Sequence, residues 1–392
     1  MIVRHFLHWV RTAPAAERAN ATAALARAYL YSELTPDDRA AAEGALVMLL
    51  DDPSPLVRSE LARALAFSEQ APPAVIHALA ADQPEVASWV LEHSPLLMDA
   101  DLVDAVATGT PQAQAAIANR PHLPRPVAAA IAEVGSAEAC LVLIENPAAE
   151  PAGFSLDRIV SRHGHLAAIR EAMLMRGDLP PATRQALLTK LSQTLAGFVT
   201  ARAWLEQERA ERVAKEACEK ATVTLAAMLP SGEIRPLIRH LRASGQLNAG
   251  LILRALLSGN LEIFEEALAE LSGMSLKRVS ALVHDIRSSG LNAVFDKAGL
   301  PASTWTAFRA AIDAMHELGF AGDAGGMTRL KRRMVERVLT RCADASDIDL
   351  EPLLLLLRRF AAEAVRDEAR MFCEELVGAD EEARDYERRA AA

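Results

Sequence analysis

Three ten-residue stretches end in proline and recur every 26 residues: Val86–Pro95 (VASWVLEHSP), Gln112–Pro121 (QAQAAIANRP) and Glu138–Pro147 (EACLVLIENP). Proline lacks a backbone N–H and its ring clashes one turn back, so a helix does not continue through it. Each stretch is therefore predicted to be a short apolar helix that its proline ends. A fixed period of this length is the sequence signature of a solenoid.

Working outward, the pattern becomes a helix–turn–helix unit that occurs four times. The predicted helix pairs are 40–50 with 56–67, 74–81 with 85–93, 102–107 with 112–119, and 127–134 with 137–146. Aligning the second helices gives two apolar sites per unit: Val57, Val86, Ala113 and Ala139, then Leu61, Val90, Ile117 and Leu143 one turn later. A spacing of four places both sites on one helix face, which must pack on the next unit. We expect an all-α protein: an α-solenoid of such repeats followed by a second all-helical domain.

The composition agrees with close-packed helices. Apolar residues make up 51% of the chain and aromatic residues only 4%, so the core must consist mostly of Ala, Leu, Val and Ile, and Ala and Leu favour helix. Segment boundaries then follow from Gly, Pro and charge. We expect four segments: 1–178, the solenoid with a helical N-terminal cap near residues 2–12; 179–230, a linking region with one long helix over 195–228; 231–321, a second helical repeat-like domain; and 322–392, C-terminal helices with a charged tail.

The negative charge is concentrated in the repeats. Residues 51–150 contain four basic and fourteen acidic side chains, a net charge of −10 that equals the net charge of the whole chain. An acidic surface repels phosphate backbones and favours basic partners. Nucleic acid is therefore not expected on this face, and the favoured partner is a protein or peptide, a basic one by charge. Whether the chain forms a homodimer stays open.

No pattern in the sequence indicates catalysis. The cysteines Cys140, Cys218, Cys342 and Cys373 are far apart and are interpreted as buried core thiols in a reducing compartment. The pair His163 and His165 lacks metal-site spacing and is assigned to a turn between helices. We expect no catalytic residue, metal or cofactor. Without a recognisable signal peptide or membrane-spanning stretch, the expected location is cytoplasmic.

Two residue sets are candidates for partner contact. In such solenoids the second helices line the inner curve, where polar side chains that do not face the core form an acidic groove suited to a peptide or helix. These residues are Arg58, Glu60, Arg63, Glu85, Ser88, Glu92, Gln112, Gln114, Glu138 and Glu145. The second set is a basic cluster suited to an anion or to an acidic surface: Arg329, Lys331, Arg332, Arg333 and Arg337.

These repeats resemble known families. Asp52-x-x-Pro-x-Val57-Arg58 resembles the turn and second helix of HEAT-type repeats. The stretches that end at Pro95 and Pro121 resemble the bacterial leucine-rich-variant repeat, a short relative. The whole block is similar to an alphaproteobacterial domain-of-unknown-function family, well over residues 40–165 and less closely over 246–310. The resemblance implies a HEAT-like α-solenoid and no activity. No cysteine precedes Cys140, so the N-terminal iron–sulfur cluster of some leucine-rich-variant proteins is not expected.

The leading hypothesis is a non-enzymatic interaction or regulatory scaffold. The alternative is a HEAT-like nucleic-acid-associated protein, such as a DNA repair glycosylase on this scaffold, and the acidic repeat block argues against it. A third hypothesis, a regulatory or lyase-like enzyme, has no recognisable catalytic residues behind it.

Overall fold

The computed structural model of the chain describes residues 9–10, 12–285, 290–318, 326–343 and 351–390. Over these residues it contains 21 helices and no strand, which confirms the all-α prediction. The chain divides into unit 1, Met1–Leu191, and unit 2, Ser192–Ala392, each with its own hydrophobic core. The expected cap near residues 2–12 and the joint at 322–325 lie mostly outside the described residues.

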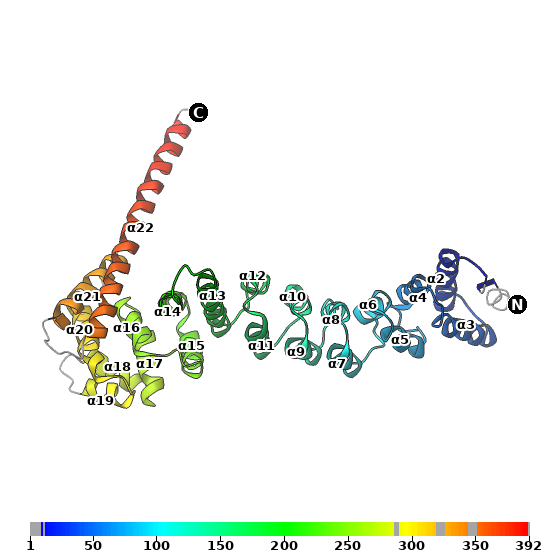
Figure 1. Cartoon of the computed structure of the whole chain (residues 1–392), viewed down its shortest axis with the longest axis horizontal. Coiled ribbons are helices and arrows are strands. Elements are labelled where there is room, and N and C mark those ends of the chain that lie inside the picture. The colour runs from blue at the N-terminus through cyan, green and yellow to red at the C-terminus, as the bar shows by residue number, and fades with distance from the viewer. Residues whose placement is uncertain (1–8, 11, 286–289, 319–325, 344–350, 391–392) are drawn as a thin grey trace. The chain divides into compact units, whose positions relative to one another are not determined.

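Unit 1 consists of short helices in pairs (Figure 1). Its helices are α2 (Ala15–Tyr31), α3 (Pro36–Leu49), α4 (Pro55–Leu65), α5 (Pro73–Ala80), α6 (Pro84–His93), α7 (Asp99–Thr108), α8 (Pro111–Ala118), α9 (Arg125–Val134), α10 (Ala137–Glu145), α11 (Gly153–His163) and α12 (Ala167–Met175). The four predicted helix pairs are confirmed as α3–α4, α5–α6, α7–α8 and α9–α10. Their starts follow the chemistry of helix N-termini: five begin with proline, and Thr35, Thr110 and Ser136 each accept a hydrogen bond from a backbone N–H of the first turn.

Packing in unit 1 connects alternate helices. Helices α2, α4, α6, α8, α10 and α12 pack one on the next, and α7, α9 and α11 do the same. Figure 1 shows the two helices of each pair in separate rows of unit 1. The eight apolar positions predicted for the second helices are all buried, and Val90, Ile117 and Leu143 have no exposed surface. The predicted register is therefore confirmed.

The residue before Pro121 and the residue before Pro147 each link their helix–turn–helix repeat to the preceding repeat. The Arg120 guanidinium donates to the backbone carbonyls of Leu91 and Ser94, the latter over 2.7 Å. One unit later, the Asn146 amide donates to the carbonyls of Ala118, over 2.8 Å, and Arg120, over 2.9 Å. These carbonyls lie at the ends of α6 and α8, where no further helical N–H follows. The α7–α8 repeat and the α9–α10 repeat thus each provide hydrogen-bond donors for the last carbonyls of the repeat before it.

Helix α13 (Pro181–Ala201) spans the boundary between the units, and α14 (Gln207–Ala227) follows it. The single long helix expected over 195–228 is wrong, because the chain turns at Ala203, which has a left-handed φ of 54°. The turn is stabilised by side chains. Trp204 packs edge-on against Phe198 with ring centroids 5.8 Å apart, and the Arg202 guanidinium lies 3.7 Å above the Phe198 ring. Neither Gly nor Pro marks this position, so the sequence did not signal the break.

Unit 2 continues with eight more helices of 8 to 40 residues among its described residues. They are α15 (Ser231–Ala243), α16 (Ala249–Leu257), α17 (Leu261–Ser272), α18 (Leu276–His284), α19 (Gly290–Lys297), α20 (Ala302–Leu318), α21 (Gly326–Ala343) and α22 (Glu351–Ala390). Helix α19 was not predicted. The predicted charged tail is part of α22, whose backbone is helical as far as Ala390. None of the described helices is long and apolar enough to span a bilayer.

Candidate functional site

The polar residues predicted to line one groove differ in exposure and in their partners: some are exposed, and others are buried or paired within unit 1. Glu85, Gln112 and Glu138 are exposed, each at the second position of its helix, α6, α8 and α10. Two of the three are acidic, as the positive end of a helix dipole favours. These three positions form a regular row along unit 1, and they are the part of the predicted set that remains available to a partner. Glu145 is also exposed, at the last position of α10.

Other members of the set are engaged within unit 1. Gln114 is buried, which corrects the expectation that it does not face the core. Its amide nitrogen donates to the Val106 carbonyl over 2.8 Å, and its amide oxygen accepts from the backbone N–H of Ser136 over 2.8 Å. The Ser88 hydroxyl donates to the Pro84 carbonyl. Gln114 therefore connects two neighbouring helix–turn–helix repeats. Helical periodicity in the sequence did not distinguish it from an exposed glutamine.

The charged members nearest the N-terminus form ion pairs. Arg58 Nε lies 2.6 Å from Asp82 Oδ2, so this arginine links α4 to the turn after α5. Burial alone would raise the pKa of the Asp82 carboxyl, but the hydrogen bonds from Arg58 and from its own turn outweigh burial and lower the pKa. Arg63 pairs with Glu60 one turn away, and Glu92 accepts a hydrogen bond from Asn119 over 2.7 Å. The two arginines of the set are thus neutralised.

A cleft of about 450 Å³ opens between the α5–α6 and α7–α8 pairs. It exists because α5 packs closely on α4 and α6 but not on α7, whereas α7 packs on α9. Its floor consists of small and apolar side chains, and its walls carry acids. The lining residues include Ala87, Leu91, Leu97, Ala105 and Ala113 below, and His77, Asp82, Asp101 and Asp104 around them.

The three acids of this cleft differ in how they are used. Asp82 is paired with Arg58. Asp101 caps α7, because its carboxylate accepts the backbone N–H of Met98 over 2.9 Å. Asp104 is exposed, and no hydrogen bond or ion pair joins its carboxylate to another described side chain or backbone group. No lysine or arginine lines the cleft. Sequence reasoning missed this site because the first helices were treated only as the outer row.

In unit 2 the basic cluster on α21 is largely paired. Lys331 Nζ lies 3.2 Å from Asp367 of α22, and Arg332 Nη1 lies 2.9 Å from Glu368. Arg337 pairs with Glu317 of α20. Arg333 is exposed, and the side chain of Arg329 is outside the described residues. Three of the five basic residues are thus paired with acids of the same unit.

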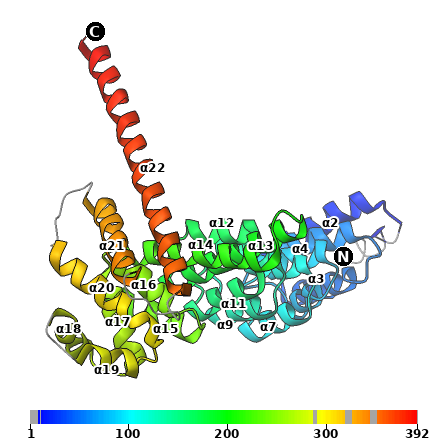
Figure 2. The ribbon, with the colours of Figure 1, turned by 60° about the vertical axis from the view of Figure 1, so that its left-hand side comes forward.

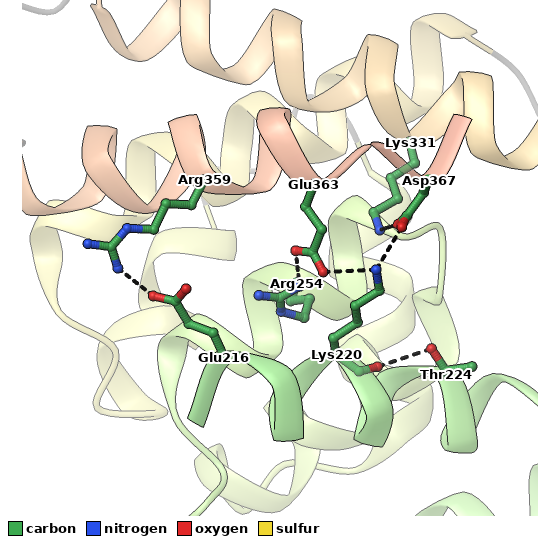
Figure 3. Close-up of polar contacts among 8 residues, drawn as sticks. All are labelled: Glu216, Lys220, Thr224, Arg254, Lys331, Arg359, Glu363 and Asp367. Carbon is green, nitrogen blue, oxygen red and sulfur yellow. Dashed lines mark hydrogen bonds and ion pairs between the residues drawn. The ribbon is translucent and has the colours of Figure 1, made fainter. Parts of the chain in front are cut away.

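Those contacts belong to a wider network, which Figure 3 shows. Glu363 of α22 binds Arg254 of α16, with Nη1 and Oε2 2.6 Å apart, and Lys220 of α14, over 3.1 Å. Lys220 also reaches Asp367 over 2.7 Å. Arg254 is only 4% exposed at its side chain, and its guanidinium lies 4.2 Å above the Phe360 ring. With Lys331 of α21, which also binds Asp367, the network joins four helices and is structural.

A second hollow, of about 580 Å³, lies in unit 2 among α14, the start of α16 and the turn after α19. Glu219 lines it and accepts a hydrogen bond from Asn248 over 3.1 Å. Burial raises the pKa of the Glu219 carboxyl, and the Asn248 hydrogen bond only partly opposes this. Acidic and basic side chains both line the hollow, Arg212 and Lys215 among the latter, so its charge selects no single ligand class.

Histidine, cysteine and acidic side chains are the usual protein ligands of zinc. Among the described side chains, no three His, Cys, Asp or Glu residues lie close enough together to hold a metal ion. His163 ends α11, and His165 lies in the turn before α12, as predicted. Cys140, Cys218 and Cys342 are buried, but Cys373 is exposed, which corrects its assignment to the core. Burial raises the pKa of the Cys140 thiol to about 11, so this thiol stays protonated.

Fold and site together define an all-helical protein with an acidic cleft and no recognisable catalytic group among the described residues. The profile of the family described as "Uncharacterised protein conserved in bacteria (DUF2336)" matches residues 86–346, about two-thirds of the chain. The chain therefore belongs to this family, and the match includes α6 to α8 of the cleft. No curated protein and no solved structure matches the chain.

Proposed function

We propose that this protein is a non-enzymatic interaction scaffold whose unit 1 is a HEAT-like α-solenoid that binds a basic segment of another protein. The observation that carries the proposal is the cleft between α5 and α7, with its apolar floor and its acidic walls. The packing of alternate helices along unit 1 supports the solenoid, because each helix–turn–helix repeat then contacts only the repeats next to it.

The cleft fits the side chain of lysine or arginine. Both residues combine an aliphatic stem, which gains from apolar contact, with a cationic head. The stem would lie on Leu91, Leu97 and Ala105, and the head would meet the carboxylates of Asp101 and Asp104. Asp104 has no partner among the described groups, so a ligand cation could form an ion pair with its carboxylate without breaking an existing hydrogen bond or ion pair. The exposed row of Glu85, Gln112 and Glu138 offers further polar contacts to an extended peptide.

Reversing the charge of Asp104 tests this proposal. The probe is a fluorescent twelve-residue peptide that alternates Lys or Arg with Ala or Leu, and its counterpart carries Glu in place of the cations. We expect the basic peptide to bind and the acidic one not to bind, by fluorescence anisotropy. Asp104→Lys should weaken binding about tenfold, which corresponds to about 1.4 kcal/mol.

Two matched variants locate the effect. Glu171→Lys introduces the same charge change on an exposed position of α12, away from the cleft, and should alter the affinity less than about twofold because solvent and salt screen distant charges. Glu138→Lys tests the second-helix row. Equal losses in Asp104→Lys and Glu171→Lys, or a basic peptide that does not bind at all, would contradict a cleft-specific site.

Duplex DNA should not bind to the repeat face of unit 1. Arg58 and Arg63, the arginines of the predicted groove, are held by Asp82 and Glu60, so neither is free to displace counterions there. We expect no binding of a 20-base-pair duplex up to about 10 μM protein at about 150 mM salt. Electrophoretic mobility shift measures this. Binding that disappears in the Arg58→Glu, Arg63→Glu variant would show that the charge argument is wrong.

A further inference from the structure

Helix α22 is much longer than the helix it packs against. It runs from Glu351 to Ala390, 40 residues, whereas α21 has 18. Only seven residues separate the end of α21 from the start of α22, so the two helices, which pack on each other, run antiparallel, and Lys331 of α21 meets Asp367 of α22. The first residue of α21, Gly326, is five residues before Lys331, so it comes level with α22 at about residue 372. The part of α22 from Cys373 onward therefore continues past α21.

The figures agree on this arrangement within unit 2. In both Figure 1 and Figure 2 the last turns of α22 extend away from the other helices of the unit. Helices in proteins owe most of their stability to the packing of an apolar face, and the projecting part of α22 lacks such packing within the unit. Its sequence is also not that of a uniformly solvated helix, which would carry polar residues on every face.

An apolar stripe lies on the open face of α22. Leu353, Leu357, Phe360 and Ala364 are buried against unit 2. On a different face Ala362, Val365, Ala369 and Phe372 are exposed, and 57% of the Phe372 surface is accessible. Their separations of three, four and three residues match the a and d positions of a heptad repeat. The sequence continues the spacing with Leu376, Ala379, Ala383, Tyr386 and Ala390.

We propose that this stripe pairs with the same stripe of a second copy of the chain, as an antiparallel two-stranded coiled coil. In an antiparallel pair each a position faces a d position. With the two-fold axis between Val377 and Gly378, each layer joins a larger residue to a smaller one. The layers are Val365 with Ala390, Ala369 with Tyr386, Phe372 with Ala383, and Leu376 with Ala379. Large and small residues that alternate across an interface fill space without voids.

The flanking charges favour this orientation over a parallel pair. In the antiparallel pair Arg366 of one copy lies opposite Glu387 of the other, at flanking e positions, and the symmetry makes this contact twice. Glu375 opposite Glu382 is the unfavourable flanking contact. A parallel pair would instead bring Glu375 near Asp380 and Glu382 near Glu387, both like-charged, and would place Phe372 against Phe372 and Ala383 against Ala383.

The experiment is sedimentation equilibrium on the full chain. Wild-type protein should be a dimer at about 20 μM, because four heptads of a and d contacts are present. Phe372→Asp should leave it monomeric at the same concentration. Phe372 is exposed in the single chain, so the substitution does not disturb the core, and an unchanged circular dichroism spectrum checks this. Arg370→Asp is the matched control, since Arg370 is exposed on α22 but off the stripe, and it should remain dimeric.

A charge swap tests the orientation. Arg366→Glu and Glu387→Arg should each weaken the dimer about tenfold, because each places like charges opposite one another twice. The double variant should recover to within about threefold of wild type. A monomeric wild type, or a dimer that Phe372→Asp leaves intact, would overturn the pairing. A dimer that Glu387→Arg strengthens and Arg366→Glu does not change would overturn the antiparallel orientation.

Discussion

Replacing Ile117 by alanine should lower the free energy of unfolding of unit 1 by about 2 to 5 kcal/mol, the usual loss for a buried large-to-alanine change. Ile117 has no exposed surface and belongs to the continuous core of unit 1. It lies on α8, which packs on both α6 and α10. The substitution removes apolar contacts with both neighbours and leaves a cavity between them.

The location of the damage is as informative as its size. If each helix–turn–helix repeat is stabilised by its nearest neighbours, Ile117→Ala should lower protection against hydrogen exchange between about residues 84 and 147. Protection over residues 246–318 should change little. Val134→Ala is a suitable control, because Val134 is 48% exposed at the end of α9. Uniform loss along the chain would indicate one cooperative domain, and no loss would mean that Ile117 does not bridge its neighbours.

Removing Glu363 should destabilise unit 2 by about 3 to 5 kcal/mol, since a buried charge then loses its main partner. Glu363 pairs with Arg254, which has 4% of its side chain exposed. In Glu363→Gln the guanidinium stays buried above Phe360 without a counter-charge. Urea denaturation of the full chain, followed by a probe in unit 2, measures the loss. Arg254→Met with Glu363→Leu should recover much of it, because neither charge is then left alone.

The exposed pair beside this one is its control. Arg359 of α22 pairs with Glu216 of α14, and both side chains are considerably more exposed than Arg254 (Figure 3). Glu216→Gln should therefore cost less than about 1 kcal/mol. Equal losses at Glu363 and Glu216 would show that burial does not control the strength of this network.

The same carboxylates set an acid limit on stability. Burial alone would raise the pKa values of Glu363 and Asp367, but the cations around them outweigh burial and lower both. Unfolded carboxyl groups titrate near about 4. The stabilisation is therefore present above that pH and is lost as the pH falls through the lower folded-state values, because the unfolded chain then binds protons first.

Repeat spacing and turn residues alone predicted most of unit 1. Prolines at the helix starts and before the turns, together with the apolar positions of the second helices, depend only on local backbone chemistry and on helical periodicity. Such signals were enough to place Val90, Ile117 and Leu143 in the core. The break at Ala203 was not predictable in this way, because Trp204 and Phe198 stabilise it through a ring contact rather than through Gly or Pro.

The candidate site depended on tertiary structure. The net negative charge of the repeat block can be counted from the sequence. The sequence does not show which of its carboxylates lack an intramolecular partner. Asp82, Asp101 and Asp104 are the same residue type, and packing between helices gives Asp82 its partner Arg58 and leaves Asp104 in solvent, whereas Asp101 caps its own helix through a local contact with Met98. Arg120 and Gln114 are the converse case, since polar residues at helix ends and faces became buried bridges. In the repeats, local sequence thus determined where helices begin and end and which helix face is apolar, because these features depend on residues close together along the chain. Partners that lie in other helices, such as Arg58 for Asp82 and Val106 for Gln114, are decided only when the helices pack.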